Sequence, residues 1–195
     1  SSDLSSDALE EMAARAVAMA REAPEDKFAG LAPQDRLMRG ALPDIESYDP
    51  TEVSPEALRA RALEAEDAAR AVAGVTNSEG GSASAGHAVV ALATSHGFAA
   101  AYAGTSHGVY ASVLAGEGSV MQRDYGHHVT RFLTDLDAAE AIGREGGELA
   151  VKRLNPIRLK SGPMPVVFDR RIGGSMVGHL VGAIMGGGIA RRVSF

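Results

Sequence analysis

The feature that most constrains the fold is an abrupt change of amino-acid composition and hydrophobic pattern at Val75. Residues 75–132 contain many glycines and are rich in alanine, serine, valine and tyrosine, whereas the segments on either side show helical periodicity. Alternation with a period of two, which is typical of strands, is clearest in His87-Val89-Ala91 and in Val109-Ala111-Val113. The small side chains predict a sheet with one face closely covered by helices, or one face lining a cavity.

Turn signals divide this region. Three short glycine-containing stretches, SHGF at 95–98, AGTS at 103–106 and GEGS at 116–119, predict three or four antiparallel strands joined by hairpins.

Helices are predicted around these strands. The first spans residues 3–22, capped by Ser6 or Asp7, and the second begins at Ser54 with Pro55 at its first position and stops at Gly74. A third starts at Thr134 and is followed by a proline-bounded connector, a short buried strand at 166–169 and a glycine-rich helix over 173–192. The sequence therefore predicts an α+β fold: an antiparallel β-meander flanked by helices, then a short strand and a glycine-rich helix.

The glycine-rich helix is unusual. Gly174, Gly178, Gly182 and Gly186 recur every four residues and so lie on one side, with His179 projecting near them. Each interior glycine costs about 1 kcal/mol relative to alanine, so a close approach by another backbone is the expected compensation. That backbone is either a neighbouring helix or a bound peptide.

Other chemistry is weakly supported by the sequence. The six histidines form no HExxH motif and no two-histidine, one-carboxylate spacing, and no cysteine is available as a metal ligand. Neighbouring His127 and His128 point to opposite faces of a strand and cannot easily share one ion. Phosphate-loop and serine-elbow motifs are also missing. The sequence predicts no catalytic residue and no metal ligand.

Composition excludes several classes of partner. A formal net charge of −6 with scattered basic residues argues against nucleic-acid binding. The uncharged stretch Ile172–Ala190 has the length of a membrane span, but seven of its residues are glycine, so a buried helix is predicted instead. The absence of cysteine fits a reducing cytoplasm.

Two long segments resemble one known family. The stretches GVTNSEGGSASAGHAVVALATSHGF and SGPMPVVFDRRIGGSMVGHLVGAIMGGGIARRVSF, with the meander between them, are similar to the PmbA branch of the TldD/PmbA family. This resemblance implies a cytoplasmic peptidase system acting on unfolded peptides, in which TldD members carry a zinc-binding HExxxH motif on the corresponding helix.

Aligning that motif with this chain places glycine and alanine where zinc ligands are needed. Gly178 and Ala183 stand at the two histidine positions, and His179 stands at the glutamate position. The resemblance therefore implies a partner subunit without zinc, a TldD-like subunit that carries the zinc, and a hetero- or homodimer when full length. His179, Gly178 and Gly182 are the candidate substrate-binding residues.

The resemblance also implies a domain division and leaves alternatives open. Residues 1–160 are expected to form part of the family's N-terminal α+β domain, and 161–195 the start of a truncated C-terminal domain, so that the chain is a fragment without activity of its own. Two other hypotheses stand beside this one. The first is a self-sufficient hydrolase that uses His179, and the second is a non-enzymatic modulator of DNA gyrase, a description also used for this family.

Overall fold

The computed structural model describes residues 4–27 and 29–193. The chain separates into two units, one spanning Pro33–Gly162 and the other made of the segments before and after it. Each unit is described by itself.

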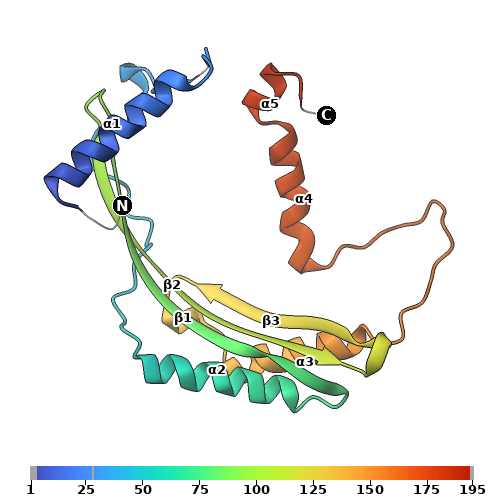
Figure 1. Ribbon diagram of the computed structural model, residues 1–195. Helices are drawn as coiled ribbons and strands as arrows, with labels where there is room; N and C mark the ends of the chain where they lie inside the picture. The colour runs from blue at the N-terminus through green and yellow to red at the C-terminus, as the bar shows by residue number, and fades with distance from the viewer. Residues whose placement is uncertain (1–3, 28, 194–195) are drawn as a thin grey trace. The chain divides into compact units, whose positions relative to one another are not determined.

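A three-stranded antiparallel sheet organises the unit 33–162 (Figure 1). Its strands are β1 (Val75–Ala93), β2 (Ala99–Ala115) and β3 (Gln122–Thr130), in the order β1-β2-β3. Strand β3 pairs only with residues 107–115 of β2, so the β1–β2 hairpin continues past the end of β3. The predicted turn at 103–106 is wrong, because these residues lie inside β2. The other two predicted turns join the strands, the second containing a 3-10 turn, η2 (Gly118–Val120).

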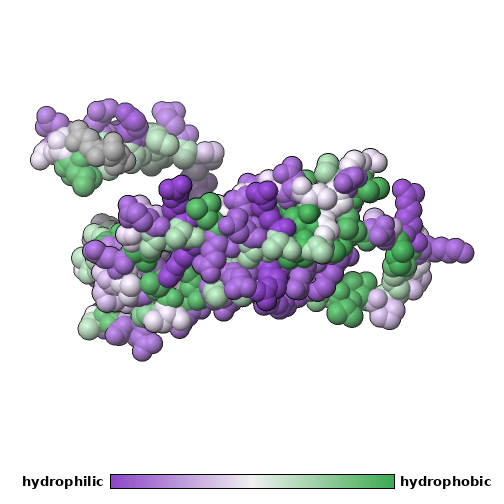
Figure 2. All heavy atoms as spheres, turned by 90° about the horizontal axis from the view of Figure 1, so that it is seen from below, coloured by the Kyte–Doolittle hydropathy of each residue, from purple (hydrophilic) through white to green (hydrophobic). Residues whose placement is uncertain are grey.

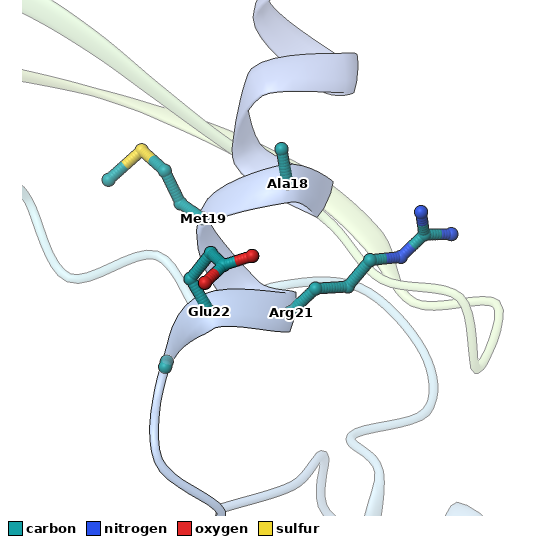
Figure 3. A pocket seen from close by; sticks show the side chains of 5 residues that line it. Ala18, Met19, Arg21 and Glu22 are labelled. Atoms are coloured by element: carbon teal, nitrogen blue, oxygen red, sulfur yellow. The ribbon is translucent and has the colours of Figure 1, made fainter.

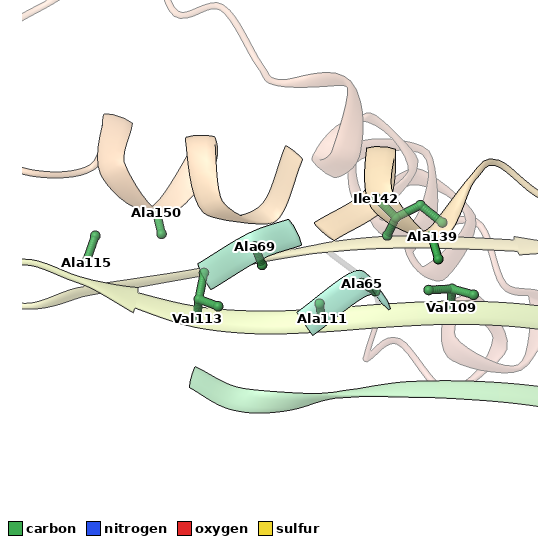
Figure 4. Close-up of a cluster of buried hydrophobic side chains, with 9 residues drawn as sticks. All are labelled: Ala65, Ala69, Val109, Ala111, Val113, Ala115, Ala139, Ile142 and Ala150. Atoms are coloured by element: carbon green, nitrogen blue, oxygen red, sulfur yellow. The ribbon is translucent and has the colours of Figure 1, made fainter. Parts of the chain in front are cut away.

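Two helices, α2 (Pro55–Arg70) and α3 (Ala139–Lys152), cover one face of this sheet (Figure 1). The core between them consists of small side chains from α2, β2 and α3, shown in Figure 4: Ala65, Ala69, Val109, Ala111, Val113, Ala115, Ala139, Ile142 and Ala150. The predicted α+β class, with a meander flanked by helices, is confirmed.

Glycine allows the helices to lie unusually close to the sheet and to each other. A Cβ at Gly143 of α3 would clash with the carbonyl oxygen of Ala65 in α2, and one at Gly126 of β3 would clash with that of Ile142. These contacts join backbone to backbone, so no change of rotamer can relieve them. Close coverage by helices, the first of the two predicted environments for the sheet, is confirmed.

Of the three helix starts predicted from capping residues, the structure confirms one, shifts one by a residue and contradicts one. Ser54 caps α2 by accepting a hydrogen bond from the Ala57 N–H, and Pro55 stands at the first position, as predicted. In α1 (Ser6–Glu22) the cap is Ser5, one residue before the predicted pair. The prediction for Thr134 is wrong: it lies in a 3-10 turn, η3 (Leu133–Asp135), and α3 begins four residues later without a side-chain cap.

The C-terminal segment differs most from prediction. No strand forms at 166–169, where Val166, Val167 and Phe168 are all exposed. Asp169 instead accepts a hydrogen bond from the Arg171 N–H and caps α4 (Arg170–Ala183). The predicted helix is interrupted at residues 184–185, before the short α5 (Gly186–Ala190), and neither helix has a buried residue.

Polar side chains occupy much of the face seen from below in Figure 2.

The connection between α1 and α2 contains a 3-10 turn, η1 (Gln34–Arg36). Among the described residues, no helix is both long enough and apolar enough to span a membrane.

Candidate functional site

The predicted substrate-binding residues lie on the exposed helix α4. His179, Gly178 and Gly182 are all exposed, and a Cβ added at either glycine would meet no atom within 4 Å. The close backbone approach predicted for this glycine stripe is therefore not present among the described residues. The helix remains a surface on which a peptide or another chain could lie.

The two residues of α4 that the resemblance aligns with zinc-binding histidines are small. Gly178 and Ala183 carry no side-chain atom that could coordinate a metal. Elsewhere in the residues that the structure describes, no group of three or more histidine, aspartate or glutamate side chains is placed to hold a metal ion.

Several other histidines have structural neighbours. The Nδ1 atom of His128 lies 3.0 Å from a carboxylate oxygen of Asp137, and the ring of His127 lies against that of Tyr125. Neighbouring His127 and His128 thus have different surroundings, as their placement in one strand predicted.

Sequence reasoning missed a buried polar cluster around Asp49. Its carboxylate accepts hydrogen bonds from the N–H groups of Thr51, at 2.9 Å, and Leu133, at 2.7 Å. The Nε2 atom of His107, a buried residue of β2, lies 3.5 Å from the same carboxylate. Only the turn-forming Asp-Pro-Thr sequence signalled a local role for Asp49, because its other partners are distant along the chain.

The main chain around Asp49 follows the edge of β2 beyond the end of β3. The Thr105 N–H donates to the carbonyl of Ser47, and the Ser47 hydroxyl donates to the carbonyl of Ala103. The Thr105 hydroxyl accepts from the Asp49 N–H and donates to the carbonyl of Arg131. We call Ser47, Asp49, Thr51, Thr105, His107 and Leu133 the Asp49 clasp, since it ties the segment 47–51 to β2 and to the chain after β3.

A pocket of about 320 Å³ lies beside the clasp. Its lining includes Glu52 and His87, and the ring of His87 packs against that of Tyr48 with the centroids 5.2 Å apart. Neither nitrogen of His107 has a hydrogen-bond partner of good geometry, and both are buried. The hydrogen bonds of the clasp, in contrast, join three parts of the chain: the segment 47–51, strand β2 and the residues after β3.

A second hollow lies against the end of α1 (Figure 3). Its lining comes from the last residues of this one helix and from Ala23 just after it, and includes Met19, Arg21 and Glu22. In Figure 3 the Arg21 side chain extends away from the helix whereas the Glu22 carboxylate stays close to it, so these two polar groups do not converge.

Hydrogen bonds to the carboxylate set the ionisation of Asp49. The hydroxyl of Thr51, and the N–H groups of Leu133 and Thr51, lower the pKa of Asp49 from 3.8 to about 2. A carboxyl group whose pKa is lower in the folded state stabilises the fold above its unfolded pKa, and this stabilisation is lost as the pH falls through the folded pKa.

This shift predicts a pH-dependent contribution to stability. The difference in unfolding free energy between the wild type and the Asp49→Asn variant is expected to be constant above about pH 5 and to shrink between about pH 4 and pH 2. Urea denaturation of both proteins from pH 2 to pH 7 measures it. A difference independent of pH would show that the charge of Asp49 does not stabilise the fold.

The residues that match known proteins include those of the clasp and of α4. A family model described as "PmbA/TldA metallopeptidase central domain" matches residues 48–154. Metalloprotease PmbA of Escherichia coli O157:H7 is 36% identical over 196 residues, covering 100% of this chain and 43% of that protein. The metalloprotease PmbA homolog of Haemophilus influenzae is 31% identical over 195 residues, covering 100% of this chain and 43% of that protein. The chain thus spans less than half the length of these relatives.

Solved structures share the fold. A crystal structure from Bacteroides thetaiotaomicron, described as a candidate modulator of DNA gyrase, matches 98% of this chain and 44% of its own with a TM-score of 0.85. TldE from Thermococcus kodakarensis matches 75% of this chain and 32% of its own with a TM-score of 0.52. Both are 21% identical to this chain, so these likenesses establish the fold alone.

Proposed function

Because the chain belongs to the PmbA/TldD metallopeptidase family, we propose that the protein is the PmbA-type subunit of a two-component peptidase whose zinc is held by a TldD-type partner. The observation that carries this proposal is the pair of side chains at Gly178 and Ala183. A zinc hydrolase needs two or three protein ligands and a group that activates water. Hydrogen and methyl side chains at the two ligand positions supply none of these.

The exposed surface of α4 supports a role in holding substrate. Glycines at 174, 178 and 182 leave room for a backbone to approach, and the helix has apolar side chains such as Leu180 and Val181 exposed beside them. An unfolded peptide offers a backbone of this kind. His179, between the glycines, can donate or accept a hydrogen bond with a peptide group.

The same proposal includes a cellular compartment and a class of substrate. The chain contains no cysteine, which fits the reducing cytoplasm in which we place the complex. The net charge of −6 gives no support to a function on DNA, so peptides are the substrates that we propose.

The test uses the full-length protein and its TldD-type partner, purified separately and together. We expect zinc in the partner and in the complex but not in this protein alone, and cleavage of an unfolded peptide only when both subunits are present. Chelation should abolish that cleavage. Metal analysis and a peptide-cleavage assay measure both.

Two results would contradict the proposal. One is a stoichiometric amount of zinc in this protein alone. The other is cleavage by this protein alone that disappears in the His179→Ala variant, which would favour a self-sufficient hydrolase. The conservative His179→Gln variant is the matched control, because it keeps a hydrogen-bonding side chain of similar size.

A further inference from the structure

The pocket beside the clasp lies on the face of the sheet that the helices cover. Its walls come from the segment 48–53, just before α2, and from strands β1 and β2. His107, in one of these walls, alternates along β2 with buried Val109, so the two side chains lie on the same face. All of the walls belong to the unit 33–162. The volume of about 320 Å³ is at the lower end of the range for ligand sites, which suits a small group.

The lining of this pocket is acidic and includes a buried charge. Asp49 and Glu52 both line it. Asp49 is only 6% exposed, and the hydrogen bonds that lower its pKa to about 2 keep its carboxylate ionised. In the described part of the chain, no lysine or arginine lines the pocket or forms an ion pair with Asp49. Buried charges are normally paired, and their surroundings screen them weakly, so the pocket attracts a cation.

His107 adds a hydrogen-bond acceptor that has no partner. Its side chain is 3% exposed, and neither ring nitrogen forms a hydrogen bond. The Nε2 atom lies 3.5 Å from the Asp49 carboxylate, which favours a proton on that nitrogen. In the neutral ring, Nδ1 is then an acceptor. A buried acceptor without a partner is rare in folded proteins, so a donor in the pocket is expected to bond to it, directly or through one water.

Aromatic rings form another part of the lining. Tyr48 and His87 both line the pocket, and their rings pack together. The Tyr48 side chain is partly exposed, so its ring is accessible to a ligand. The face of such a ring attracts cations. Negative charge, an acceptor without a partner and an aromatic ring together favour a cation that also donates hydrogen bonds.

We propose that this pocket binds a primary ammonium group, either the N-terminal amine of a peptide or the side chain of a lysine. An ammonium group has three N–H donors in different directions, so it can bond to acceptors on both the segment 48–53 and the strands. A quaternary ammonium has no donor for His107. A carboxylate or phosphate would be repelled by the charge of Asp49. The pocket is separate from the surface proposed on α4, and this proposal does not depend on the peptidase function.

Three apolar peptides of equal length, all with amidated C-termini, test the class of ligand on the full-length protein. The first has a free N-terminus and no lysine, the second is the same peptide acetylated, and the third is acetylated and contains one lysine. We expect the second to bind at least about tenfold more weakly than the tighter of the other two, because it has lost a charge-assisted hydrogen bond. Isothermal titration calorimetry near neutral pH measures this.

The tighter of the first and third peptides identifies whether the ammonium group comes from an N-terminus or from a lysine. Equal affinity for all three peptides, or binding of none of them, would overturn the proposal. A peptide held by α4 through its backbone would bind equally with and without the acetyl group, because acetylation removes only the N-terminal charge.

A reversal of charge then locates the site. Glu52→Lys puts a positive charge at the pocket without removing any hydrogen bond of the clasp. Glu148→Lys, on α3, is the matched control, because Glu148 is also exposed and does not line the pocket. We expect Glu52→Lys to bind the tighter peptide at least about tenfold more weakly than the wild type, and Glu148→Lys to stay within about twofold.

Circular dichroism confirms that both variants are folded. Equal affinities of Glu52→Lys and Glu148→Lys for the peptide would show that the ammonium group binds elsewhere and would overturn the proposal. The zinc content of the two subunits, which tests the peptidase function, does not depend on this pocket, so either proposal can fail while the other stands.

Discussion

Replacing Gly143 by alanine is expected to destabilise the unit 33–162 by about 3 kcal/mol or more, the upper end of the usual cost of overpacking. The added methyl group would clash with the carbonyl oxygen of Ala65, and the carbonyl carbon and Cα of Ala65 would also be only 2.7 Å and 3.0 Å from it. A clash with backbone can be relieved only by moving α2 away from α3, which would open the core between them. Since domains of this size are stable by only about 5–15 kcal/mol, thermal or urea unfolding would detect the loss easily.

The same substitution on α4 is the matched control. Gly178 is also a helical glycine, but a Cβ there would meet no atom within 4 Å. Alanine is favoured over glycine in an exposed helix by roughly 0.5–1 kcal/mol, so Gly178→Ala should not destabilise α4. Because α4 lies outside the unit 33–162, the unfolding of that unit should stay unchanged. If the two variants proved equally stable, the close contact between α2 and α3 would be wrong.

Replacing Asp49 by alanine is expected to be the second large effect. The substitution removes the acceptor for the N–H groups of Thr51 and Leu133 and the charged neighbour of buried His107. Both hydrogen bonds are partly buried, and a donor shielded from water that loses its partner costs more than the hydrogen bond was worth, so we expect the melting temperature to fall by on the order of 5–10 °C. Differential scanning calorimetry measures this fall.

One control variant and one further measurement on Asp49→Ala separate the role of the clasp from a general effect of mutation. Asp44→Ala removes a carboxylate that also accepts a main-chain hydrogen bond, from Glu46, but at an exposed site, and should change the melting temperature little. Limited proteolysis of Asp49→Ala should show earlier cleavage near residues 47–51, because the clasp ties that segment to β2. Equal protease resistance in the wild type and Asp49→Ala would show that the clasp does not hold the segment.

The position of the close glycine contacts shows where sequence reasoning succeeded and where it failed. The four-residue glycine spacing on 174–186 led to the expectation of a close backbone approach there, but the structure describes none. Close approaches to backbone occur instead at glycines of β1, β3 and α3, among them Gly126 and Gly143. Spacing shows that glycines share one side of a helix, but it does not show whether another element lies against that side.

Local signals were decisive for the secondary structure. Period-two alternation located the strands, and Ser54 followed by Pro55 located the start of α2, because each depends on residues within a few positions of one another. The kinds of residue at Gly178 and Ala183, which the resemblance aligns with zinc-binding histidines, were also known directly from the sequence, since neither hydrogen nor methyl can coordinate zinc in any conformation.

Long-range pairing was decided by the tertiary structure alone. Asp49 and Leu133 are 84 residues apart, and no pattern near either residue indicates the hydrogen bond between them. Thr134 could cap a helix locally, but the chain forms a 3-10 turn there. The sequence by itself determined the class of fold and the absence of zinc ligands at 178 and 183, because both depend on the kinds of residue and their short-range order. The tertiary structure decided which glycines are crowded and where Asp49 is buried, because these depend on what lies nearby in space.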